Sequence, residues 1–145
     1  MFAIINPWAA LVAAVAAYLV GWAWYSPLLW QKPWMAARGD TGENWEAEGK
    51  KEMPKIMFYG FVNTLLMSFT IAVLLTLTGA TTLVMSLQVA LLFCFGLVVT
   101  VKFNDLLYTS NPPHWGRRAQ LLFLIDSGYL IALFIIVTTI LWWMS

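Results

Sequence analysis

Four long apolar runs constrain the fold of this chain more than any other feature of its sequence. Each contains close to the number of residues, about 20, that an α-helix needs to cross the hydrocarbon core of a bilayer. The runs are Pro7–Tyr25, Met57–Thr78, Thr82–Val101 and Leu121–Trp143. The sequence therefore predicts an all-α polytopic membrane protein, with four transmembrane helices in a bundle that forms a single membrane domain over residues 1–145.

The composition excludes an ordinary soluble protein. Hydrophobic residues make up 61% of the chain and charged residues only 10%, whereas soluble domains carry about 25% charged residues. A chain of this length could not bury so much apolar surface in a core of its own. We therefore expect membrane lipids as partners, and the net charge of +1 gives no reason to expect a nucleic acid.

The basic residues predict the orientation of the chain in the membrane. All eight lie either between the first two runs or at the segment that joins the last two. The positive-inside rule then predicts that both charged loops are cytoplasmic and that both termini lie outside. The first run lacks a preceding basic segment and exceeds the apolar core of about 7–15 residues in a signal peptide, so we expect it to be retained.

Residues 26–56 form the largest polar segment. Its first part, PLLWQKPWM, is too short to span and too aromatic for free solution, so we expect it to lie in the membrane interface. The later part is polar, and we expect it to be helical from about Glu43 to Met53, with acids before lysines. Tryptophans near the ends of the runs are typical of aromatic belts, with Trp8, Trp142 and Trp143 at the outer interface and Trp22, Trp24, Trp30, Trp34 and Trp115 near the inner one.

One carboxylate, Asp126, lies inside the fourth run in the stretch LLFLIDSGYL. An isolated ionised Asp in a span costs at least about 2.5–3.5 kcal/mol, so it must take up a proton or find a partner. Counted from the outer ends of the spans, Asp126 is about 25 Å deep and polar groups of the other spans are about 22–30 Å deep. Lys102 is the expected ionic partner, within a candidate intramembrane polar cluster of Tyr25, Ser26, Asn63, Lys102, Asp126 and Tyr129.

A second interpretation of Asp126 is structural. The residue could be the N-cap of a shorter fourth span that begins at Ser127. Arg118–Ile125 would then be an interfacial segment, and Ser127–Met144 would still be long enough to cross the membrane.

Small residues recur every fourth position on the spans and predict where the helices touch. They allow close approach of helix backbones in lipid, and the expected packing residues are Ala9, Ala13, Ala17 and Gly21 on the first span and Gly60, Thr64, Ser68 and Ala72 on the second. The turn Thr78–Thr82 is very short, with Gly79 as a helix stop. We therefore expect spans two and three to form a tight antiparallel hairpin.

The sequence contains no pattern typical of catalysis or metal binding. His114, in the loop NPPHWG, is the only histidine, and Cys94, in an apolar run, is the only cysteine. Neither has the neighbours that a metal site requires, and phosphate-binding loops and nucleophile–base sets are absent. We expect no metal, no cofactor and no enzymatic activity.

Two segments resemble a known family. WYSPLLWQKPWM, Trp24–Met35, is similar to a WYSPLLFGKxWM-like motif, and LIDSGY, Leu124–Tyr129, is similar to a LIDAGYYL-like segment. Together they resemble the bacterial and fungal membrane proteins of domain-of-unknown-function family 1761. Trp30 and Gln31 stand where that motif usually has Phe and Gly. The resemblance implies a four-span membrane protein, and it implies no activity. We expect the protein in the bacterial cytoplasmic membrane.

Three functions remain open at this point. The first is a structural or accessory membrane subunit, a homo-oligomer such as a dimer or part of a larger complex, with the polar cluster as internal support. The alternative is a small proton- or cation-coupled transporter that uses Asp126. The third is a lipid-modifying enzyme with His114 near an acid. A water-accessible cavity at Asp126 would favour transport, whereas a dry and fully partnered cluster would favour the structural role.

Overall fold

The computed structural model describes residues 5–39, 49–109 and 116–145. Among these residues, four helical segments are long and apolar enough to cross a membrane, as the sequence predicts. The third combines two short π-helical segments with two α-helices, so that Leu83–Tyr108 forms one candidate span. In chain order the elements are α1 Pro7–Trp24, α2 Gln31–Arg38, α4 Lys50–Thr78, α5 Leu83–Phe93, η3 Cys94–Val99, α6 Thr100–Asn104, η4 Asp105–Thr109 and α7 Arg117–Trp143.

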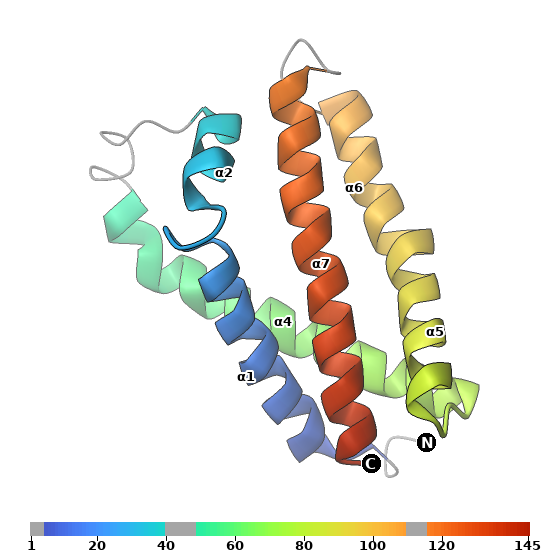
Figure 1. Cartoon of the computed structure of the whole chain (residues 1–145). Helices are drawn as coiled ribbons and strands as arrows, with labels where there is room; N and C mark the ends of the chain where they lie inside the picture. Colours follow the sequence, from blue (N-terminus) through green and yellow to red (C-terminus); the bar gives the residue numbers. More distant parts are fainter. Residues whose placement is uncertain (1–4, 40–48, 110–115) are drawn as a thin grey trace.

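Helices α1 and α7 form the centre of the bundle. Helix α1 packs against both α4 and α7, and α5 packs against α7. Figure 1 shows α7 between α1 and the α5–α6 segment, with α4 crossing behind them at a steep inclination. The short helix α2 lies beside the part of α7 that begins at Arg117. The start of α1 and the end of α7 therefore lie at the same end of the bundle.

Helix α1 begins at Pro7 because the preceding residue caps it. The Asn6 side-chain oxygen accepts hydrogen bonds from the backbone N–H groups of Trp8, at 3.1 Å, and Ala9, at 3.3 Å. Pro7 has no N–H to satisfy, so it suits the first turn of a helix. The Asn6 amide also donates to the carbonyl of Met144 at 3.4 Å, which joins the start of α1 to the end of α7.

Small residues line the contacts of α1 with α4 and α7. The buried residues of this helix are small, namely Ala9, Ala10, Ala13, Ala14, Ala17 and Gly21. On α4, Thr64, Ser68 and Ala72 are buried, and the Ser68 hydroxyl donates to the Ala10 carbonyl at 2.8 Å. A hydrogen bond from a side chain of one helix to the backbone of the next requires close backbones, which small residues allow. Gly60 faces the Tyr18 ring instead of another small residue.

The prediction that spans two and three pack as a tight hairpin is wrong, although the turn between them is short. The turn is short, since α4 ends at Thr78, Gly79 has a φ of 63° and α5 begins at Leu83. However, α4 packs more extensively against α1 than against α5, and the two helices diverge from the turn (Figure 1). The physical reason is that the small-residue face of α4 is occupied by α1, so the turn connects the two spans without aligning them.

The helices also extend beyond the apolar runs at the end of the bundle that carries α2. Helix α4 begins at Lys50 instead of Met57, the third span reaches Tyr108 instead of Val101, and α7 begins at Arg117 instead of Leu121. Backbone hydrogen bonds continue a helix into the interface whether or not its side chains are apolar. With 29 residues, α4 is about 43 Å long. This exceeds the hydrocarbon thickness of about 30 Å and agrees with its inclination.

Two local predictions are affected by these boundaries. The N-cap interpretation of Asp126 is wrong, because α7 starts at Arg117 after its N-cap Gly116 and continues through Asp126. The helix expected from about Glu43 to Met53 falls partly outside the described residues, and its last residues from Lys50 onward belong to α4. The loop NPPHWG, with His114 and Trp115, also lies largely outside the described part of the chain.

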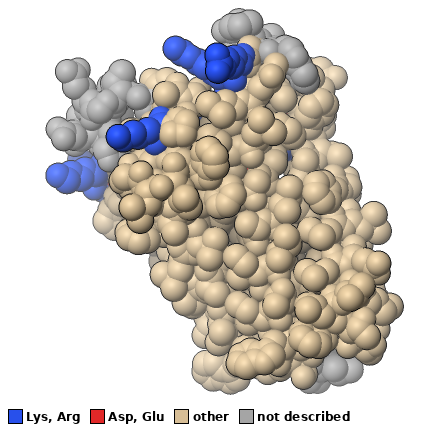
Figure 2. Space-filling view, in the orientation of Figure 1, with Lys and Arg blue, Asp and Glu red and all other residues tan. Residues whose placement is uncertain are grey.

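Lysine and arginine gather at one end of the molecule. Figure 2 shows them on the visible face near the end opposite to the start of α1 and the end of α7. We call this the basic end; its residues are Lys32, Arg38, Lys50, Lys51, Lys55, Lys102, Arg117 and Arg118. At the other end, Trp8 and Trp143 are strongly exposed, as expected for residues at a lipid–water interface.

The packing of α1 predicts the effect of enlarging one of its alanines. Ala13→Leu should lower the free energy of unfolding by about 1–3 kcal/mol, because the site is fully buried between helices and extra methyl groups cannot be accommodated. The measurement is thermal unfolding of the purified protein in detergent. Val15→Leu is the control, because Val15 is exposed on the same helix and should have little effect. Equal stability of both variants would contradict this packing.

Candidate functional site

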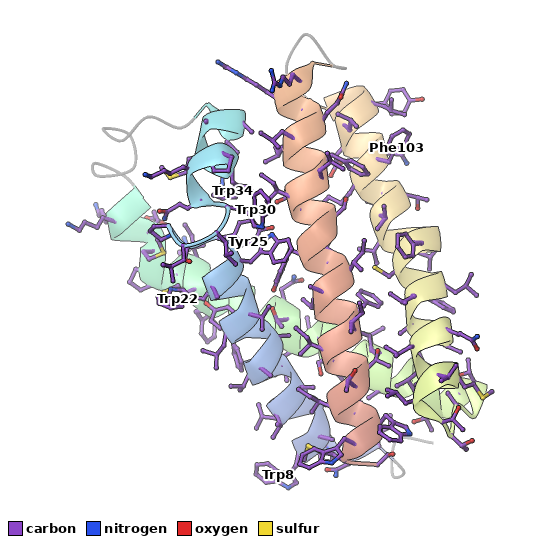
Figure 3. All side chains as sticks on the ribbon, viewed as in Figure 1. Trp8, Trp22, Tyr25, Trp30, Trp34 and Phe103 are labelled. Carbon is purple, nitrogen blue, oxygen red and sulfur yellow. The ribbon has the colours of Figure 1, made fainter. Side chains whose placement is uncertain are left out.

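Among the described residues, the Asp126 carboxylate has three partners, each from a different element. Its Oδ1 accepts hydrogen bonds from the Tyr25 hydroxyl at 2.8 Å and from the Trp34 indole Nε1 at 3.0 Å. The Lys102 Nζ lies 3.9 Å from Oδ2. Tyr25 follows α1, Trp34 is on α2 and Lys102 is on α6. We call these four residues the Asp126 cluster, and Figure 3 shows Tyr25 and Trp34 reaching toward α7.

The charges and donors of the cluster suit an ionised carboxylate. Two neutral donors point at one oxygen, and hydrogen bonds to an ionised acceptor are stronger than those between neutral groups. The ammonium group on the other side supplies the opposite charge, although its distance is at the outer limit of an ion pair. The Asp126 side chain is 21% exposed and that of Lys102 is 40% exposed. The cluster is therefore only partly closed, on the side of Lys102.

The turn after α1 places both hydrogen-bond donors. Ser26 is buried, and its hydroxyl donates to the Ala23 carbonyl at 2.7 Å while accepting from the Leu28 N–H at 3.3 Å. These bonds hold the chain in a compact turn, after which α2 begins at Gln31. Tyr25 at the end of α1 and Trp34 on α2 thereby come to the same carboxylate. Ser26 shapes this arrangement and does not itself contact Asp126.

Aromatic rings form a layer around the two donors. The Tyr25 ring lies 5.0 Å from the Trp34 ring and 5.4 Å from the Tyr129 ring, measured between centroids. The Arg38 guanidinium lies 4.5 Å from the centroid of Trp34, a distance typical of cation–π contact. These neighbours restrict the rotamers of both donors and so keep them directed at Asp126.

Two glycines allow large rings to approach the helix backbones. A Cβ on Gly21 of α1 would come within 2.6 Å of the Tyr129 hydroxyl, and one on Gly128 of α7 would come within 3.1 Å of the Trp24 ring. The Trp24 indole also donates to the Ile125 carbonyl at 3.1 Å. The segments Trp24–Met35 and Leu124–Tyr129, which carry the family resemblance, therefore lie directly against each other.

The six residues of the expected polar cluster have different places in the structure. Tyr25 and Lys102 contact Asp126, whereas Ser26 and Tyr129 support the surroundings. Asn63 is the exception: it is exposed on α4 and is not among the partners of Asp126 in the described residues. Equal depth along a span does not determine which face of the helix carries a residue, and this is why the inclusion of Asn63 was wrong.

Trp34 is the partner of Asp126 that the sequence did not reveal. Its position in an aromatic segment near the interface suggested a belt residue, and nothing in its spacing points to Asp126. The only available signal was its place in the motif that resembles the family, together with the indole N–H that a carboxylate can accept. Trp22, by contrast, is 68% exposed and points away from the bundle (Figure 3), as a belt residue does.

A groove lies between α6–η4 and α7 on the Lys102 side of the cluster. Its volume is about 520 Å³, and it is lined by both charged and apolar residues. We call it the α6–α7 groove; its lining residues are Lys102, Asp105, Leu106, Ala119, Leu122, Phe123 and Asp126. Within the described residues, no group of three or more His, Cys, Asp or Glu side chains could hold a metal ion.

Comparison with known proteins identifies a family but no activity. No curated protein and no solved structure matches the chain. A family model described as "Protein of unknown function (DUF1761)" matches residues 8–142. The match covers both segments that meet at Asp126 and nearly the whole length of the sequence. The chain belongs to the DUF1761 family of proteins of unknown function.

Proposed function

We propose that this protein is a structural or accessory subunit of the bacterial cytoplasmic membrane, in which the Asp126 cluster holds the helices together at the basic end. The observation that carries the proposal is that one carboxylate binds groups from the end of α1, from α2 and from α6. The cluster thus supports the arrangement of the whole basic end.

The energies involved are sufficient for such a role. Hydrogen bonds within membrane proteins contribute roughly 0.6–2 kcal/mol each, and an ionised Asp without partners costs at least about 2.5–3.5 kcal/mol. The donors Tyr25 and Trp34, together with the charge of Lys102, offset this cost in the assembled bundle. A disassembled bundle would leave the carboxylate without them, so the cluster favours one packing of the helices.

The orientation of the protein follows from the same end of the molecule. The basic end carries every Lys and Arg of the chain, and basic residues favour the cytoplasmic side of a membrane. In this orientation both termini face outward, and the Asp126 cluster lies in the inner leaflet. Helix α2 then lies at the cytoplasmic interface.

The lateral faces of the bundle are suited to lipid and to a second subunit. In the third span, only 17% of the residues in an apolar stretch of 18 are buried inside the bundle. Leu92, Leu97 and Val101 on this span are strongly exposed. In the proposed role these apolar faces contact membrane lipids and a second copy of the chain or a partner membrane subunit. A homodimer would bury part of the surface that four spans leave open.

Removal of the carboxylate tests the structural role. Asp126→Leu and Asp126→Asn should each lower the free energy of unfolding by a kilocalorie or more, of the order of about 0.6–2 kcal/mol for each lost hydrogen bond. The measurement is thermal unfolding in nanodiscs. In a Lys102→Met background the cost of Asp126→Leu should shrink, because no ammonium is left without its partner. A neutral or stabilising effect of Asp126→Leu would contradict the structural role.

The Trp34 hydrogen bond allows a sharper test. Trp34→Phe keeps an aromatic ring but removes the N–H, and should destabilise the protein by about 0.6–2 kcal/mol. In the Asp126→Leu background the same change should cost much less, since the acceptor is gone. Trp22→Phe is the matched control, because Trp22 is exposed outside the cluster. Additive effects of Trp34→Phe and Asp126→Leu would show that the two residues do not interact.

One observation favours a second function, that of a small proton- or cation-coupled transporter. The α6–α7 groove reaches Asp126, and the side chain of Lys102 is 40% exposed. The carboxylate could therefore exchange a proton or cation with the cytoplasmic side. An acid inside a membrane span is a candidate transport site for this reason.

Transport predicts an activity that depends on Asp126. In vesicles loaded with a pH-sensitive dye, the wild-type protein should speed the decay of an imposed pH gradient, and Asp126→Asn should abolish that effect. Asp105→Asn is the control, because Asp105 lines the same groove but lies outside the cluster. Equal decay in vesicles with and without wild-type protein would argue against proton coupling.

A further inference from the structure

The α6–α7 groove has the size and position of a binding site at the membrane surface. Its volume of about 520 Å³ falls within the range of about 300–1,000 Å³ typical of small-molecule pockets. It extends along α7 from Ala119 to Asp126, which is about two helical turns. Arg117 and Arg118 lie just before Ala119, at the start of α7, and are exposed. The groove therefore connects the headgroup level of the basic end with the Asp126 cluster.

The lining of the groove offers both signs of charge. Lys102 contributes an ammonium group, and Asp105 and Asp126 contribute carboxylates. A ligand with a single charge would meet a like charge in this groove. A zwitterion, with an anionic and a cationic group a few bonds apart, would find an opposite charge for each of its groups.

The two oxygens of Asp126 are used unequally. Oδ1 accepts two short hydrogen bonds from Tyr25 and Trp34, whereas Oδ2 has the Lys102 ammonium at 3.9 Å as its partner in the described residues. A carboxylate has about four acceptor positions, and an ammonium has three donors. Oδ2 can therefore accept from an additional cation, and Lys102 can donate to an additional anion, without loss of the bonds at Oδ1.

Apolar side chains also line the groove. They are Leu106 on η4 and Leu122 and Phe123 on α7, and the Phe123 ring packs against Phe103 at a centroid distance of 5.6 Å. The lining includes the start of the π-helical segment Asp105–Thr109. Such segments are frequent at functional sites in α-helices. The groove thus combines charges of both signs with apolar side chains, as a phospholipid headgroup and its acyl chains require.

We propose that the α6–α7 groove binds an aminophospholipid from the leaflet at the basic end. The primary ammonium of its headgroup donates to Asp126 Oδ2 and Asp105, its phosphate accepts from Lys102, and its acyl chains lie against Leu106, Leu122 and Phe123. A primary ammonium has N–H donors for the carboxylates, whereas a quaternary ammonium has none. A lipid with an anionic headgroup and no amine could pair with Lys102 but would bring no cation to Asp105 and Asp126.

Lipid competition tests this assignment. The purified protein is reconstituted in nanodiscs containing equal parts of phosphatidylethanolamine, phosphatidylcholine and phosphatidylglycerol with identical acyl chains. The protein is then released from the nanodiscs, and the lipids that stay bound to it are quantified by native mass spectrometry. Phosphatidylethanolamine should be retained in excess over both other lipids, by at least about threefold, the smallest effect of one membrane hydrogen bond. Equal retention, or preference for phosphatidylglycerol, would overturn the proposal.

Variants of the groove show whether the preference arises there. Lys102→Met and Asp105→Asn should reduce the excess of phosphatidylethanolamine, and Ala119→Phe should do so by filling the groove without changing its charges. Lys55→Met is the matched control, because Lys55 is exposed on α4 and pairs with Glu52 outside the groove. An unchanged preference in Lys102→Met, Asp105→Asn and Ala119→Phe would place the lipid elsewhere.

Competition with a soluble headgroup distinguishes binding of a lipid from binding of a free headgroup. Soluble phosphoethanolamine, added in excess to the nanodiscs, should not displace the bound phosphatidylethanolamine, because it lacks the acyl chains that contact the apolar lining residues. Complete displacement by this molecule would show that the groove recognises a water-soluble zwitterion and would overturn the assignment to a lipid. The readout concerns bound lipid and not stability, so it is independent of the structural role proposed for the cluster.

Discussion

The carboxylate of Asp126 is the constraint on which the basic end of this structure depends. An ionised acid in a membrane span is costly without partners, and the chain supplies them from Tyr25, Trp34 and Lys102. These residues come from parts of the sequence on both sides of α4. The acid therefore does not mark a break in α7 but joins α7 to the end of α1, to α2 and to α6.

The contact between two distant sequence motifs explains why small residues lie beside large rings in this region. Gly21 leaves space for the Tyr129 hydroxyl, and Gly128 leaves space for the Trp24 indole. Without these glycines the backbones of α1 and α7 would stay further apart, and Tyr25 could not reach the carboxylate at hydrogen-bond distance. The polar contact and the close helix packing consequently depend on each other, as is usual for buried polar networks.

Asp126 also connects the interior of the bundle with its surface. Its Oδ1 accepts hydrogen bonds from donors at the end of α1 and on α2, and the residue also lines the α6–α7 groove. The proposed structural role uses Oδ1, and a ligand or proton would use Oδ2.

The sequence by itself determined the four apolar spans, the stop at Gly79 and the choice of Tyr25 and Lys102 as partners for an acid. These features depend on local hydrophobicity, on backbone chemistry and on depth, which can be counted along a helix. Depth, however, leaves the rotation of each helix and the order of its neighbours open. Only the tertiary structure therefore excluded Asn63, brought Trp34 to Asp126 and packed α4 more extensively against α1 than against α5. Those outcomes depend on which helix faces meet, and small-residue packing between distant segments decides that.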